Sequence, residues 1–207
     1  MLLERVSETE WRAVEAGERL RTLGLVNSRT PVQLAVDRTR LDVLRLSCLP
    51  QAELYRAIDY DTMPPLEVRF LGTPVGIFLL DGRPDPIYAA ARSLSGKPDE
   101  HSAIGFLRFF FEHSFGPGRG FRLLQEPADV IFTGVATMAD HRRVAELVRP
   151  ALAQPADNGG IRIDGVVGFR DALFAVLVDI ESDWTVRVRA ASRLADGLPI
   201  VARLLQH

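Results

Sequence analysis

The sequence has 207 residues with 25 basic and 27 acidic side chains, a formal net charge of −2 and an apolar content of 47%. A chain of this length can bury roughly 70% of the surface that it exposes when unfolded, so we expect an ordered core and exclude a disordered protein. The balanced charge predicts that neither nucleic acid nor an anionic membrane is a partner, because both attract proteins with a basic surplus.

The single lysine, Lys97, stands among arginines, and we interpret this excess of arginine as the base-composition bias of a GC-rich bacterial genome. Cys48 is the single cysteine of the sequence and cannot form an internal disulfide. The amino terminus carries Glu4 and Arg5 where a signal peptide needs an apolar run, and the longest uncharged stretch is much shorter than the about 18 residues of a membrane-spanning helix. We therefore expect a cytoplasmic protein.

The first part of the chain is expected to begin with a surface helix and to continue with strands. Ser7 and Glu10 have the spacing of a capping box, and a helix with a small apolar side is expected over 8–22. Farther on, apolar and polar residues alternate, which predicts strand pairs and a short helix between them. The expected segments are strands at 32–36, 41–46, 66–71, 75–80 and 87–91, and a short helix at 51–58.

A helix rich in phenylalanine is the most informative element. It is expected from Glu100 to Phe115, with Asp99 as the residue that caps its start. At about 100° per residue its apolar side chains cover roughly 240° of the circumference, whereas a surface helix has an apolar arc nearer 100°. The helix must therefore be enclosed by a sheet that curls around it or by a sheet and further helices.

The remaining chain predicts more strands than helices. Thr137, with Asp140 at the third following position, predicts the start of a helix that continues to about residue 152. The tail from Pro199 to Leu205 fits a helix and an edge strand equally well. The expected strands are 121–124 and 130–135, followed by 161–169, 172–180 and 184–189, which short turns join into an antiparallel meander.

Because the strands follow one another without strict alternation with helices, the pattern favours the α+β class over a doubly wound parallel sheet. We expect a curved, mainly antiparallel sheet packed around the phenylalanine-rich helix, with additional helices covering it. The expected organisation is a single domain over 1–207, and the alternative is two lobes, 1–96 and 97–207.

Candidate ligand-binding residues lie on the polar stripe of the phenylalanine-rich helix, which contains His101, Arg108 and Glu112. His101 and Glu112 are about 16 Å apart along the helix axis, too far to act on one atom. The Arg108 guanidinium either forms an internal pair with Glu112 or faces an opening where an anionic ligand binds. If it binds a ligand, Arg108→Ala abolishes binding and leaves the fold intact.

The glycine-rich segment 116–120 contains the fourth candidate, Arg119, which with Arg122 could hold an anion. This segment closes a helix, whereas phosphate loops open one, so a tight turn is the favoured interpretation. His113 and His141 have no further ligand at metal-binding spacing, so we expect neither a metal site nor a cofactor.

The remaining candidate groups have structural interpretations. Cys48 fits a small buried hydrophobic residue, and no serine has the glycine-flanked turn of a hydrolase. The acidic pairs Asp59 with Asp61 and Asp81 with Asp85 are typical of solvated turns.

The sequence leaves two functional hypotheses. The favoured one is a non-catalytic binding or protein-interaction domain, with a homodimer through an exposed strand such as the terminal meander as one form. The alternative is a small enzyme with a pocket between helix and sheet, which acts on an anionic small molecule.

Overall fold

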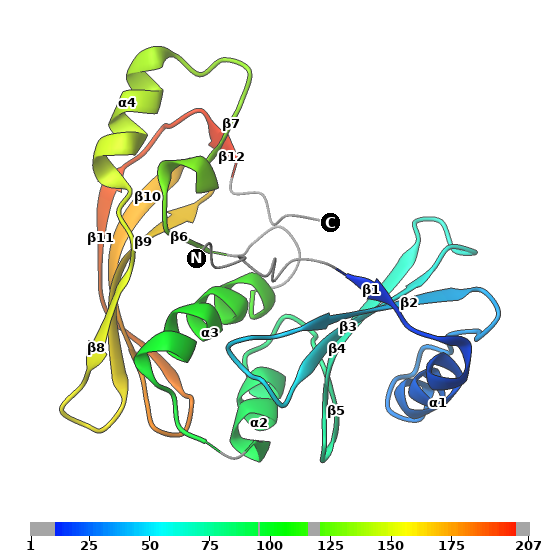
Figure 1. Cartoon of the computed structure of the whole chain (residues 1–207). Coiled ribbons are helices and arrows are strands. Elements are labelled where there is room, and N and C mark those ends of the chain that lie inside the picture. The colour runs from blue at the N-terminus through cyan, green and yellow to red at the C-terminus, as the bar shows by residue number, and fades with distance from the viewer. Residues whose placement is uncertain (1–10, 95, 116–120, 202–207) are drawn as a thin grey trace, which may run out of the picture. The chain divides into compact units, whose positions relative to one another are not determined.

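The computed structural model describes residues 11–94, 96–115 and 121–201, and Figure 1 shows the path of the chain. The chain forms two compact units, Met1–Leu80 and Asp81–His207. The boundary between them falls at the end of the first group of strands, whereas the two-lobe alternative places it after residue 96.

In its described residues, 11–80, the first unit contains one helix and an antiparallel sheet whose five strands follow one another in chain order. The helix packs its buried residues Leu23 and Val26 into the same core as Leu41, Ala57 and Phe70 of the sheet. The elements of this unit are β1 (Arg12–Ala13), α1 (Ala16–Asn27), β2 (Thr39–Arg45), β3 (Glu53–Asp59), β4 (Leu66–Thr73) and β5 (Gly76–Leu79).

The structure corrects two predictions at the start of this unit. The helix begins at Ala16 instead of residue 8, because Arg12 and Ala13 pair with β2 as a short strand; Ser7 and Glu10 lie outside the described residues. No strand forms over 32–36. The side chain of Asn27 donates to the Leu34 carbonyl and accepts from the Leu34 N–H, so this backbone is held by the end of α1 instead of by a neighbouring strand.

The predicted short helix at 51–58 is also wrong, since this segment forms β3 between β2 and β4. Its buried residues include Leu54, Ala57 and Asp59, and its partners on both sides supply the hydrogen bonds that a helix would make internally. The strands predicted at 41–46, 66–71 and 75–80 are confirmed as β2, β4 and β5.

The second unit contains a larger antiparallel sheet in the order β11-β10-β9-β6, with β8 pairing beside β6 on β9. A two-stranded sheet joins β7 and β12. The elements are α2 (Asp85–Ser93), α3 (Glu100–His113), β6 (Arg122–Leu124), the 3₁₀ helix η1 (Pro127–Asp129), β7 (Ile131–Phe132), α4 (Met138–Leu147), β8 (Leu152–Pro155), β9 (Ile161–Phe169), β10 (Ala172–Ile180), β11 (Val186–Ala195) and β12 (Ile200–Val201).

The phenylalanine-rich helix α3 is enclosed, as its sequence predicts. It begins at a capping box in which Asp99 accepts from the Ser102 N–H, and it packs on β6, β8 and β9. Phe106 is 0% exposed, while Phe115, just beyond the end of the helix, is 38% exposed. The other buried side chains of the helix are Ala103, Leu107, Phe109, Phe110 and Phe111.

The helix α4 covers the opposite face of the same sheet (Figure 1). Thr137 caps it as predicted, and its residue Val144 shares a core with Val166 of β9. Phe169 of β9 stacks on Phe121 within the aromatic cluster that continues to α3. Val166 and Phe169 point to opposite faces because side chains alternate along a strand. The α+β class with a curved antiparallel sheet around the phenylalanine-rich helix is therefore confirmed.

Three further segments of the second unit refine the predictions. Residues 87–91 lie in the helix α2 instead of a strand, and Ile87, Ala90 and Ala91 are buried at helical spacing. The helix that starts after Thr137 ends at Leu147, and the chain then forms the strand β8. The tail contributes the strand β12, and the residues after 201 lie outside the described part.

Candidate interaction surface

The polar stripe of α3 brings two of the predicted site residues together. Nε of Arg108 lies 3.5 Å from Oε1 of Glu112, one turn farther along the helix. The two side chains are 41% and 32% exposed, so their charges are partly screened by solvent. His101 lies in the first turn of the helix and is exposed, and Arg119 lies outside the described residues.

This arrangement predicts a small effect of Arg108→Ala on stability. An ion pair over one helical turn at a half-exposed position contributes less than about 0.5 kcal/mol, so the variant should unfold within that margin of the original protein. Urea denaturation of Arg108→Ala beside Glu112→Ala measures the effect. A loss above about 2 kcal/mol would contradict a solvent-screened pair and assign Arg108 a place in the core.

The side chains of His113 and His141 contact aromatic rings. The His113 ring lies 4.5 Å from that of Phe109, and the His141 ring stacks on Phe132 at 3.8 Å between centroids. Within the described ranges, no group of three or more histidine, cysteine, aspartate or glutamate residues is placed to hold a metal ion. Both rings therefore contribute to packing.

The acidic pairs shape turns. Oδ1 of Asp59 accepts from the N–H of Asp61, and Oδ1 of Asp81 accepts from the N–H of Arg83, each over two residues. An aspartate that accepts from the backbone two residues farther on is typical of a turn. Cys48 is buried.

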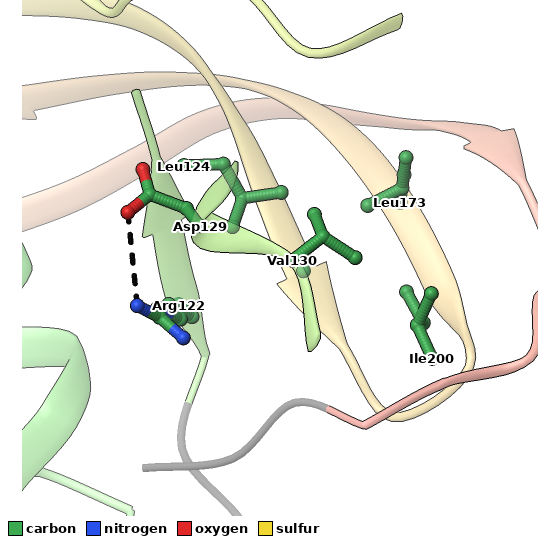
Figure 2. Close-up of a pocket in the computed structure, with 7 residues that line it drawn as sticks. Arg122, Leu124, Asp129, Val130, Leu173 and Ile200 are labelled. Carbon is green, nitrogen blue, oxygen red and sulfur yellow. Dashed lines mark ion pairs between the residues drawn. The ribbon is translucent and has the colours of Figure 1, made fainter. Parts of the chain in front are cut away.

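A small cavity lies between β6, η1 and the strands around them (Figure 2). Figure 2 shows Leu124, Val130, Leu173 and Ile200 on its apolar side, with Arg122 and Asp129 paired at one end. The cavity volume is about 10 Å³. That volume holds about one water molecule, whereas small-molecule sites measure about 300–1,000 Å³. This cavity is therefore a packing defect or a water site and is too small for a metabolite.

The surface with the clearest potential for binding is the strand β11. Among the described strands it pairs with β10 alone. The N–H and C=O of Val186 are hydrogen-bonded to the Tyr88 hydroxyl, and beyond Val186 the outer edge offers its backbone N–H and C=O groups. All residues over 187–193 are exposed, on both faces of the sheet. By contrast, most residues of its neighbour β10 are buried or half-buried. We call residues 186–195 the β11 edge.

The register of the β11 edge shifts twice against β10. Arg189 and Leu194 have no opposite residue in β10, which marks two β-bulges. Between the bulges the pairing is regular, and Ala190, Ala191 and Ser192 carry small side chains. This middle stretch leaves the backbone of the edge accessible.

A buried carboxylate lies beside the β11 edge. Asp179 of β10 is 1% exposed, and its oxygens accept from Nε of Arg162 and Nε of Arg189, each at 2.8 Å. The hydrogen bond from Arg162 is the main reason why the pKa of Asp179 lies below its usual range, and Arg189 adds to it against the opposite effect of burial. The carboxylate therefore stays ionised and holds two arginines on the surface of the sheet.

Two more arginines of the β11 edge are paired at its ends. Arg187 contacts Glu181 at 2.5 Å, and Arg193 contacts Asp196 at 3.0 Å. The terminal meander was expected as an interaction surface, but its arginines were not among the predicted site residues. The alternation of Arg187 and Arg189 in the predicted strand 184–189 is the signal that could have identified them.

Taken together, the fold and this surface define an α+β protein with an exposed, arginine-bearing edge strand. Comparison with known protein families finds no matching family model, and comparisons with curated proteins and with solved structures also find no match. Of the helices in the described part of the chain, none has the length and apolar character needed to cross a membrane.

Proposed function

We propose that this chain is a non-catalytic protein-interaction domain of a cytoplasmic bacterial protein, and that it binds a partner along the β11 edge. The observation that carries the proposal is the exposure of residues 187–193 on both faces, next to a backbone that over these residues has a strand partner, β10, on one side only within the described part of the chain. Such an edge accepts an extended segment by strand addition, in which main-chain hydrogen bonds supply the affinity.

The enzyme alternative receives less support. It requires a pocket between helix and sheet of several hundred Å³ with converging titratable groups. The cavity at Arg122 and Asp129 has about 10 Å³, and the stripe residues Arg108 and Glu112 form an ion pair on the surface of α3. The observations therefore favour an interaction domain.

Proline substitutions in the middle of the β11 edge test the proposal. Successive N–H groups of an edge strand point alternately toward the sheet and away from it. Of Ala191→Pro and Ser192→Pro, one therefore removes a hydrogen bond to β10 and lowers stability, while the other removes an outward donor and leaves stability nearly unchanged. Thermal unfolding identifies which variant is which.

The stable proline variant should then lose binding. A displayed library of random 12-residue peptides is first selected for binding to the full original chain. The affinities of the enriched peptides for the original chain and for the stable proline variant are then measured by fluorescence anisotropy. We expect the stable variant to bind at least about tenfold more weakly, which corresponds to about 1.4 kcal/mol. Selected peptides that bind the variant as well as the original chain would refute strand addition at the β11 edge.

A further inference from the structure

Resting on the proposed function, we infer that the partner segment at the β11 edge is an acidic, extended stretch of another protein. The strand β11 has ten residues, three of which are arginines and none of which is acidic. Arg187 and Arg193 pair with Glu181 and Asp196, but their side chains are 57% and 62% exposed and that of Arg189 is 46% exposed, so the three guanidinium groups remain accessible to a partner. Complementary charge along an edge directs the choice of partner.

The acidic counterpart of Arg189 lies beneath the surface. Asp179 is 1% exposed, whereas the arginines that it holds, Arg162 and Arg189, are 32% and 46% exposed. Among the contacts of the described residues, Arg189 engages Asp179 through Nε alone, which leaves both of its Nη groups for a ligand. Guanidinium groups bind carboxylates with two parallel hydrogen bonds, so a carboxylate of the partner fits these donors.

The same residues disfavour a second copy of this chain as the occupant. Pairing of two β11 edges would bring the three arginines of each copy beside those of the other, and like charges across a strand pair are destabilising. An acidic segment avoids this repulsion and is therefore the occupant that the charges favour.

Three synthetic peptides test the inference on the full chain. They are ten residues long and alternate threonine with glutamate, with glutamine or with lysine, and each carries a fluorescein for anisotropy measurements. We expect the glutamate peptide to bind at least about tenfold more tightly than the glutamine peptide at low salt, with a preference that falls as salt screens the charges. Backbone amide shifts in the β11 edge should accompany binding.

Two arginine variants localise the effect. Arg187→Gln removes one exposed cation of the β11 edge and should weaken the glutamate peptide about threefold to tenfold. Arg21→Gln, on an exposed position of α1 in the first unit, is the matched control and should leave the affinity unchanged.

The outcomes separate the inference from the proposed function. Equal binding of all three peptides at the β11 edge would overturn the acidic partner and retain strand addition. Tighter binding of the lysine peptide would likewise overturn the acidic partner and retain strand addition. Failure of every peptide to shift the β11 amides, or a concentration-dependent dimer that Arg187→Gln strengthens, would overturn both.

Discussion

Replacing Phe106 with alanine is expected to lower the free energy of unfolding by about 3–5 kcal/mol, because the ring is fully buried and its removal leaves a cavity. Phe106 is 0% exposed. Its ring meets that of Trp184 edge to face at 4.8 Å and lies 6.4 Å from that of Phe110.

The contact with Trp184 explains why the effect should spread beyond α3. Trp184 lies in the turn between β10 and β11, and its indole N–H donates to the Gly96 carbonyl that precedes α3. From the same turn, the Asp183 carboxylate pairs with Arg92 of α2. Loss of the Phe106 ring should therefore weaken the packing of α2 and α3 against the turn between β10 and β11.

Urea denaturation followed by circular dichroism measures the loss. Phe106→Leu keeps most of the volume and should cost about 1–1.5 kcal/mol, so it reports on the site even if Phe106→Ala does not fold. Phe115→Ala is the matched control, since Phe115 is 38% exposed and should lose less than half as much. Equal losses at Phe106 and Phe115 would contradict the enclosed arrangement of α3.

Asp179→Asn is expected to lower the free energy of unfolding at pH 7 by about 1–3 kcal/mol, because a neutral amide cannot satisfy Arg162 and Arg189 together. The effect is smaller than that of a fully buried ion pair, because the two guanidinium groups are 32% and 46% exposed and reach solvent. Asp196→Asn is the matched control: the Arg193–Asp196 pair is exposed on both sides and should contribute under about 0.5 kcal/mol.

The difference between Asp179→Asn and the original chain should depend on pH. Since the pKa of Asp179 is lowered in the folded state, mainly by the hydrogen bond from Arg162, its contribution is fully present above the unfolded pKa of about 3.9. The contribution is lost as the pH falls through the lower, folded-state pKa. Denaturation curves from pH 7 downward should therefore show the two proteins converging in acid, and a constant difference would refute this account.

Much of the second unit could be predicted because its signals are local. Asp99 and Ser102 form a capping box within four residues, and the apolar arc of α3 requires enclosure whatever the partners are. The meander strands β9 and β10 match their predicted ranges because each is a run of apolar residues that ends at a turn.

The short segments were mispredicted for a common reason. The runs at 51–58 and 87–91 are too short to distinguish a period of two from a period of 3.6 residues. In the structure the first becomes β3 because strands pair with both of its edges, and the second becomes α2 because Ile87, Ala90 and Ala91 share one buried face.

By itself the sequence determined the α+β class, the enclosed helix and the terminal meander, because caps, turns and hydrophobic periodicity act over a few residues. The tertiary structure alone decided that β11 is the edge strand of its sheet in the described part of the chain and that Asp179 lies beneath Arg162 and Arg189. Arg162 and Arg189 are 17 and 10 positions from Asp179, and strand register brings them together. Register and edge position arise from hydrogen bonds between strands, so no local pattern contains them.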